Sequence, residues 1–575
     1  MRSLPTGSEF EVIVVGGGPA GSATAALLAQ QGRRVLLLER TPFPRHHVGE
    51  STLLSIHSPL NWLGVAEKVA AAGFRRKTGG SYIWGVDRIP WSFHFSEIND
   101  QAAASRPSYS YEVERDLFDA ILLDHAEECG AKVLRDVTVQ DYLIEDGYGV
   151  RGVRTGDDRA GATGTEITAS LVVDASGQGC LSGRRFGWRG MHGRLRNSAA
   201  YGYWSGGPPE YTRLGGDLTP ADHSNILICS TEFGWIWVIP LRGDRVSIGT
   251  VSAGRTEHWD GRRGQEIYYD RVRSCTELSP ILQLLAPLSR EPVRFVRDWS
   301  YRCSQFSAPG LLLVGDAACF VDPILSTGLH LALRGGISAA CVANSVLGGG
   351  DERLARLWYD STYSAAYEQY EQMALWWYHG DRNRERWFER SRRLIDRNDF
   401  GRDLPPRKAF IHLAAGLDAA NYVEECVEEW AHPLRMEALF HKHASFTASL
   451  PRLRERFGVS PVMDPEPSAP ERRDGADIPA AKGPRIRRDA VLSVAADPDG
   501  VRIRMYWNAS SPHNGDLRVD LTGLEALLSR CDGSRTIEQI EGDLDLGEDD
   551  QGIVRGAVEE LARAGLLEGV GAPSA

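Results

Sequence analysis

Lysine is scarce in this chain, in which only six of the 65 lysine and arginine residues are lysine. Arginine keeps its proton at any working pH, whereas a desolvated lysine can lose it and act as an amine nucleophile or donor. Lys77 directly follows two arginines in the stretch "RRKTGG". We therefore take Lys77 as a candidate functional residue, with an ordinary surface lysine as the alternative.

Paired cysteines, long apolar runs and an excess of positive charge are also lacking. The nine cysteines contain no CxxC pair, which speaks against a zinc site and a disulfide framework. No stretch reaches the roughly 18 apolar residues of a membrane helix. The N-terminus has no basic leader, so we expect a cytoplasmic enzyme. The net charge of -12 argues against nucleic-acid binding.

The N-terminal stretch "EFEVIVVGGGPAGSATAALLAQQGRRVLLLER" predicts a strand, a glycine turn, a helix and a second strand. The turn carries the GxGxxG pattern at Gly16, Gly18 and Gly21, and the second strand ends at Glu39. Such glycines permit a tight turn and the close approach of a pyrophosphate, while the acidic residue is placed for a ribose hydroxyl. A dinucleotide site is therefore predicted here.

The stretch "GLLLVGDAACFVDP" decides between FAD and NAD. It resembles the second FAD motif of aromatic-hydroxylase-type flavoproteins, in which the aspartate, here Asp316, holds the ribityl chain. Arg45 and Arg115 stand where that group has FAD-contacting arginines, although either alone would suggest a surface charge. A second nucleotide fingerprint for NAD(P)H is not found in the sequence. The predicted FAD-binding residues are Gly16, Gly18, Ala20, Gly21, Glu39, Arg40, Arg45, Ser51, Arg115, Asp316 and Gly328.

Four parts of the chain are expected. Residues 1–350 form an FAD-binding and substrate unit with a substrate β-sheet at about 199–251, and residues 351–461 a helical region. The proline-rich residues 462–488 are a linker. Residues 489–575 form a small α+β, winged-helix-like module, in which "AVLSVAA", "VRIRMYW" and "LRVDL" are strands. Its acidic composition disfavours DNA binding and leaves an interaction, lid or supporting role.

The stretch "GWIWVIP", residues 234–240, predicts a strand with two tryptophans on one face. Period two places Trp235, Trp237 and Ile239 together, so this face forms an aromatic wall. Core packing is the simpler interpretation, and a wall is compatible with it.

In four stretches the chain resembles the flavin-dependent halogenases: "GGGPAG", "FPRHHVGES", "GWIWVIP" as that family's WxWxIP signature, and "GDAACFVDPILSTGLHLA". Two more, "KTGGSYIWGVDRIPWSFHF" and "RDWSYRCSQF", look most like the branch of the chloramphenicol pathway, which acts on small or carrier-bound acyl and phenolic substrates. The resemblance spans roughly residues 9–345.

The resemblance implies a two-compartment mechanism. Reduced FAD, O2 and chloride yield hypochlorous acid, which passes through a short tunnel to a lysine that steers chlorine onto an electron-rich carbon. Lys77 matches that lysine, and Trp235 and Trp237 match a barrier that keeps the substrate from the flavin. The implied partners are a separate flavin reductase and, for a tethered substrate, an acyl or peptidyl carrier protein.

The turn before the helix at "STGLHLA" is the predicted chloride site, through backbone N–H groups of Thr327 and Gly328. The tryptophan-type branch carries a glutamate just before this turn. Here the residues are Ile324, Leu325 and Ser326, so Ser326 or Thr327 would have to orient hypochlorous acid. Lys77, Ser326 and Thr327 are thus the predicted catalytic residues.

The sequence therefore predicts an α/β, Rossmann-like FAD-binding fold of the aromatic-hydroxylase type and oxidative chlorination in secondary metabolism. A flavin-dependent monooxygenase of the same fold is the alternative, against which Lys77 and the WxWxIP stretch speak. A flavoprotein scaffold without turnover is a third, which would require the C-terminal module to dominate.

Overall fold

The computed structural model describes residues 9–417 with gaps at 86, 99–106, 146–148, 157–163, 254–260, 298, 379–383 and 398–403, and five strands beyond residue 484. The chain divides into two compact units, Met1–Glu437 and Ala438–Ala575. Within the described residues, no helix has the length and apolar character needed to cross a membrane. The seven described cysteines are free.

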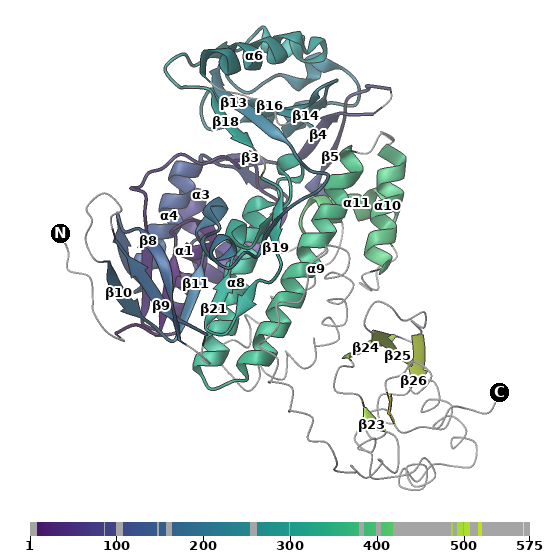
Figure 1. Cartoon of the computed structure of the whole chain (residues 1–575). Helices are drawn as coiled ribbons and strands as arrows, with labels where there is room; N and C mark the ends of the chain where they lie inside the picture. The colour runs from purple at the N-terminus through teal and green to yellow at the C-terminus, as the bar shows by residue number, and fades with distance from the viewer. Residues whose placement is uncertain are drawn as a thin grey trace, which may run out of the picture. The chain divides into compact units, whose positions relative to one another are not determined.

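A mainly parallel six-stranded sheet forms the base of the first unit (Figure 1). Its strands, in spatial order, are β20 (Ser307–Ala308), β21 (Leu311–Leu313), β11 (Leu171–Asp174), β1 (Val12–Val15), β2 (Val35–Glu39) and β7 (Lys132–Arg135). The strands β1, β2, β11 and β21 are buried throughout, as continuous apolar runs in a parallel sheet should be. The predicted strand–turn–helix–strand unit is confirmed.

The helix α1 (Pro19–Gln30) packs against β1 and β2, and the helices α4 (Arg115–Glu128) and α8 (Gly328–Leu347) pack against α1. The helices α1 and α8 meet where Thr24 Oγ1 donates to the carbonyl of Gly336 at 3.0 Å. A Cβ at Gly336 would lie 2.4 Å from the Ala20 carbonyl oxygen, so only glycine permits this approach. It brings the glycine turn and the start of α8 to one place.

An eight-stranded sheet carries the predicted wall. Its strands are β17 (Ala286–Pro287), β13 (Ser198–Ser205), β16 (Arg245–Ser252), β15 (Gly234–Pro240), β14 (Ile226–Ser230), β4 (Gly79–Ile83) and β5 (Trp91–His94), with β18 (Arg294–Arg297) paired to β13. Ile236 and Val238 pack with Tyr268 and Val272 of α6 (Gly261–Ser274) in a core on one face. The alternate residues of β15 face the other way.

The first unit contains further helices and strands. They are α2 (His57–Leu63), α3 (Ala66–Ala71), β3 (Arg75–Lys77), β6 (Ser110–Glu112), β8 (Val139–Glu145), β9 (Gly149–Thr155), β10 (Thr165–Thr168), α5 (Leu181–Arg185), β12 (Arg189–Met191), α7 (Ser279–Leu282), β19 (Tyr301–Cys303), β22 (Cys319–Phe320), α9 (Glu352–Tyr378), α10 (Arg384–Arg397) and α11 (Pro406–Ala414). The helix α9 runs beside α8 (Figure 1). The expected helical region is thus described as far as residue 417.

The second unit contains an antiparallel sheet of β24 (Val491–Asp497), β25 (Gly500–Tyr506) and β26 (Asp516–Val519). These are the three strands that the sequence predicts. Separately, β23 (Arg485–Ile486) pairs with β27 (Leu567–Glu568). Most of the expected linker and the expected helices of the module lie outside the described residues.

Gly249 of β16 lies directly opposite Trp237 of β15, and a Cβ at Gly249 would lie 2.1 Å from the indole ring. We expect Gly249→Ala to displace Trp237 and to destabilise the unit by about 1–3 kcal/mol, the usual effect of overpacking. The thermal unfolding midpoint should fall. Gly193→Ala is the control, because a Cβ there meets nothing within 4 Å. Equal midpoints for both variants would contradict the expectation.

Candidate active site

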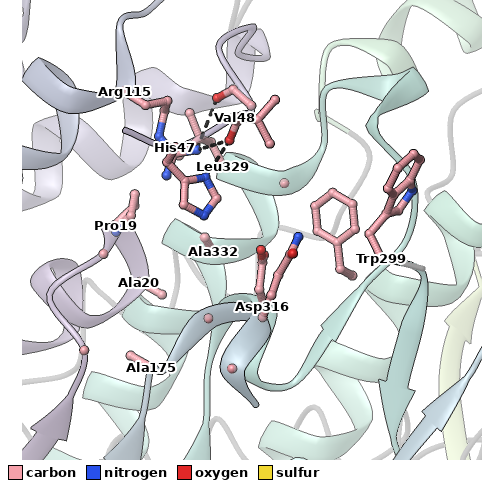
Figure 2. Close-up of a pocket in the computed structure, with 18 of the residues that line it drawn as sticks. Pro19, Ala20, His47, Val48, Arg115, Ala175, Trp299, Asp316, Leu329 and Ala332 are labelled. Atoms are coloured by element: carbon pink, nitrogen blue, oxygen red, sulfur yellow. Dashed lines mark hydrogen bonds between the residues drawn. The ribbon is translucent and has the colours of Figure 1, made fainter. Parts of the chain in front are cut away.

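A cavity of about 490 Å³ lies where the glycine turn, the start of α8 and the inner face of the eight-stranded sheet meet (Figure 2). It is lined by the predicted FAD-binding residues except Gly21, and by the wall residues Trp235, Trp237 and Ile239. A Cβ at Gly21 would instead lie 2.0 Å from the Gly16 carbonyl oxygen, so this glycine serves the packing of the turn. Residues from five separate stretches of the chain therefore share one cavity. Neither Lys77 nor Thr327 lines it.

The glycine turn has the close packing that the sequence predicts. Gly16 has a φ of +107°, and a Cβ there would lie 2.4 Å from the Ala175 carbonyl oxygen. A Cβ at Gly18 would meet only the Arg45 guanidinium, at 3.2 Å, so Gly18 faces the cavity. Glu39 accepts hydrogen bonds from the amides of Gly17 and Thr41, each at 2.7 Å. Glu39 therefore fixes the turn, and its binding of a ribose stays a prediction.

The segment after β2 lines the cavity and is held by Arg115 (Figure 2). Arg115 donates to the Val48 carbonyl at 2.8 Å and forms a two-point contact with Asp119 at 2.7 and 3.0 Å. Most of its hydrogen-bond donors are thus engaged within the protein. Arg115 therefore positions the backbone at Val48 and Gly49, and because it also lines the cavity, its contact with FAD stays a prediction.

The residues present fit FAD. Arg45 lines the cavity, and its Nε is buried with no hydrogen-bond partner among the described residues. A buried donor of this kind costs about 1–3 kcal/mol unless a ligand accepts from it. Asp316 also faces the cavity, and burial raises its pKa to about 6. A dinucleotide requires a positive side chain beside the glycine turn, for its pyrophosphate, and an acidic side chain that can accept hydrogen bonds from its sugar hydroxyls.

The turn before α8 divides the predicted chloride residues. Ser326 and Gly328 line the cavity, whereas Thr327 is buried beside it as the residue that precedes the helix. Ser326 has a φ of +57°, a left-handed conformation that few non-glycine residues adopt. Gly328 and Leu329, the first residues of α8, both line the cavity, and the first N–H groups of a helix lack partners within the helix.

The Trp235 side chain is held in place by a buried hydrogen-bond network that the sequence did not predict. Its indole Nε1 donates to Tyr378 Oη at 2.8 Å, and that hydroxyl donates to Asp322 at 3.0 Å. Asp322 also accepts from Asn197 Nδ2 at 2.9 Å and from the Trp299 indole. Burial raises the pKa of Asp322 to about 6. The sequence shows only that an aspartate precedes Pro323. The network could not be predicted from it, because Asn197, Trp299 and Tyr378 lie far from Asp322 along the chain.

Lys77 is buried, with 3% of its surface exposed. Its Nζ donates to Ser51 Oγ at 2.8 Å and to the Thr52 carbonyl at 2.9 Å. Ser51 lines the cavity, so one hydroxyl separates the amine from it. Burial lowers the pKa of Lys77 from its ordinary value, and the charge of Glu112 opposes that shift. The alternative of an ordinary surface lysine is excluded.

Glu50 is a second group that the sequence did not single out. It lines the cavity, and Tyr203 Oη donates to its Oε1 at 2.7 Å. Burial raises the pKa of Glu50 to about 7. No pattern in the sequence distinguishes this glutamate from the many on the surface, because its burial arises from β13 and β16.

The fold and the cavity define an FAD-dependent flavoprotein, and comparison with known proteins agrees. Residues 9–372 match the family model described as an FAD binding domain. The chain is 33% identical over 396 residues to tryptophan 2-halogenase of Chondromyces crocatus, covering 67% of this chain and 71% of that protein. It is 33% identical over 395 residues to a flavin-dependent halogenase of Armillaria mellea, covering 66% and 73%.

Solved structures give the same result. The flavin-dependent halogenase CmlS has a TM-score of 0.61 at 25% identity, covering 97% of this chain and 96% of that one. The myxobacterial chondrochloren halogenase CndH has a TM-score of 0.57 at 29% identity, covering 76% and 96%. The chain belongs to the flavin-dependent halogenases, and its cofactor is FAD.

Gly18→Val should fold but lose FAD, because the added side chain occupies the cavity at the point predicted for the pyrophosphate while touching little protein. Purified protein should lack visible flavin absorbance, with an unfolding midpoint near that of the flavin-free wild type. A Gly18→Val variant that purifies fully loaded with FAD would contradict the assignment of the glycine turn as the pyrophosphate site.

Tyr378→Phe should leave the Trp235 indole N–H without its acceptor and remove one donor from buried Asp322. We expect a loss of about 1–3 kcal/mol of stability, the usual cost of unsatisfied buried polar groups. Chemical denaturation of the full chain measures it. Tyr109→Phe is the control, because Tyr109 is only half-buried, in a separate ring cluster with His57 and Tyr111, and is absent from this network. Equal stability of the two variants would contradict the role given to Tyr378.

Proposed function

We propose that this halogenase chlorinates an electron-rich phenolic or activated acyl substrate in natural-product biosynthesis, with hypochlorous acid passing from the FAD cavity to Lys77. The observation that carries the proposal is the buried Lys77 amine, one hydroxyl away from a cavity fitted for FAD. Burial disfavours the ammonium form, and a neutral amine is the form that accepts an electrophilic halogen.

The bound cofactor, as FADH2, would supply two of the electrons that reduce O2, and chloride would supply the other two as it is oxidised to hypochlorous acid. Residues 326–328 bind chloride in this proposal, since the free N–H groups at the start of α8 favour an anion. Ser326 orients the hypochlorous acid in place of the glutamate found in the tryptophan-type branch. Ser51, between the cavity and Lys77, marks the path that it takes.

Trp235 and Trp237 exclude the substrate from the flavin. Both indoles are buried, and Trp235 is fixed through Tyr378, so the barrier is rigid. A rigid barrier separates halogenation from hydroxylation, because only a small molecule can pass. The monooxygenase alternative would need the substrate on the flavin side of these two indoles.

Two partners complete the proposal. A separate flavin reductase supplies FADH2, and an acyl or peptidyl carrier protein presents the substrate if it is tethered. The sequence favours the first, since it has a single dinucleotide fingerprint.

The function is tested by incubating the full-length protein with a flavin reductase, NADH, O2 and chloride. The reporter substrate is monochlorodimedone or a simple phenol. We expect a monochlorinated product with the chlorine isotope pattern in its mass spectrum, and none without chloride. Oxidation of FADH2 with a hydroxylated product instead would establish the monooxygenase alternative.

Lys77→Arg and Lys77→Ala should both bind FAD and oxidise FADH2 at near wild-type rates. Both should lose chlorinated product by at least about a hundredfold, or ~2.7 kcal/mol of transition-state stabilisation. Arginine keeps the charge but cannot supply a neutral amine, so it is the sharper test. A Lys77→Arg variant that chlorinates within a few-fold of wild type would reduce Lys77 to a steering charge.

A further inference from the structure

Glu112 is the nearest carboxylic acid to Lys77 in the strand pair of β3 and β6. Lys77 pairs with Ser110, and Arg75 pairs with Glu112. Residues opposite one another in an antiparallel pair share a face, as do residues two apart on one strand. Lys77 and Glu112 are therefore diagonal neighbours on one face, and both are buried, with exposed fractions of 3% and 0%.

The carboxyl group of Glu112 lacks the partners that a buried charge requires. Neither oxygen has a hydrogen-bond partner of acceptable geometry within the described part of the chain. A buried carboxylate without such partners is strongly disfavoured, so the group takes up a proton readily. Burial raises the pKa of Glu112 to about 8, against the opposing effects of Lys77, the Ser51 hydroxyl and the Ile226 backbone N–H. The other titratable groups acting on it are Glu50 and Tyr211.

Ser51 connects the amine to the acid. Its Oγ accepts a hydrogen bond from Lys77 Nζ at 2.8 Å, which leaves its own hydroxyl hydrogen for another acceptor. Ser51 and Glu112 are paired by an isolated antiparallel bridge. The Ser51 hydroxyl stabilises the Glu112 carboxylate, although it lies outside ordinary hydrogen-bond geometry in this structure. A small rotation of either side chain completes the connection.

We propose that Glu112 stores the Lys77 proton during halogen transfer and exchanges it through Ser51 Oγ. This inference rests on the proposed function. In the resting pair, an ammonium and a carboxylate become an amine and a carboxylic acid. The Nζ proton moves to Ser51 as the Ser51 hydroxyl proton moves to Glu112, with no change in total charge.

The amine then attacks the chlorine of hypochlorous acid. The N–Cl bond forms, the O–Cl bond breaks, and the hydroxide leaves as water with one amine proton. Glu112 returns its stored proton to the chloramine nitrogen, which makes nitrogen a better leaving group. Chlorine passes to the substrate carbon, the nitrogen keeps the N–Cl electron pair, and the proton lost from that carbon restores the ammonium–carboxylate pair.

Glu112→Gln tests the exchange, because glutamine keeps the shape of the side chain but holds no acidic proton. The readout is the ratio of chlorinated product to FADH2 oxidised, measured with the full chain, reductase, chloride and reporter phenol between about pH 6 and 9. We expect a nearly flat profile for wild type up to about pH 8, near the pKa of Glu112, because below it the Lys77–Glu112 pair keeps its shared proton. In Glu112→Gln the chloramine must be protonated from solvent, so the ratio should fall about tenfold for each pH unit.

Three further variants keep the test decisive. Glu112→Asp should recover a shallow profile, because it restores an acid. Ser51→Ala should reproduce the steep profile by removing the connection, and it serves if Glu112→Gln does not fold. Glu114→Gln is the matched control and should keep the wild-type profile, because the Arg242 amide already donates to Glu114 at 3.0 Å.

The outcomes separate the two proposals. Glu112→Gln and Ser51→Ala with the wild-type pH profile, even at a lower overall rate, would overturn the proton exchange and leave the proposed function intact. A wild-type chain that oxidises FADH2 without making chlorinated product at any pH would overturn both.

Discussion

The close approach of α1 and α8 at Gly336 is the constraint on which the site depends. One Cβ at that position would collide with the Ala20 carbonyl, and the two helices would separate. Their N-termini would then no longer point into one cavity. Gly315, whose Cβ would lie 3.0 Å from Ala20 Cβ, shows the same demand for small residues. The FAD cradle and the turn at residues 326–328 therefore share a single packing solution.

Alternate residues of the strand β15 face opposite sides of the eight-stranded sheet, so one set builds the hydrophobic core and the other lines the cavity. In β15 the aliphatic residues Ile236 and Val238 build the core beneath α6, while Trp235 and Trp237 face the cavity. The Trp237 indole fits on the inner face only because the residue opposite it on β16 is Gly249, which has no side chain. Barrier and core thus stabilise one another.

Several buried ionisable side chains line the cavity or lie next to residues that line it. Lys77, Glu112, Glu50 and Asp322 are all at least nine-tenths buried, and burial shifts the pKa of each toward its neutral form. Burying such groups costs stability, so their presence next to one cavity indicates chemistry rather than packing. Ordinary folding would be served better by apolar residues there.

The glycine turn, Glu39, the wall and Lys77 were evident in the sequence, because each depends on local spacing or on an unusual residue choice. Period two alone placed Trp235 and Trp237 on one face. The partners of these residues were decided only by the tertiary structure. Tyr378 lies 143 residues from Trp235, and Glu112 is brought to Lys77 by strand pairing across the segment between them. The contacts of Arg115 with Val48 and Asp119 were likewise decided by the tertiary structure, while its contact with FAD stays a prediction. The sequence cannot show which glutamates are buried, because burial and hydrogen bonding are set by contacts between distant segments.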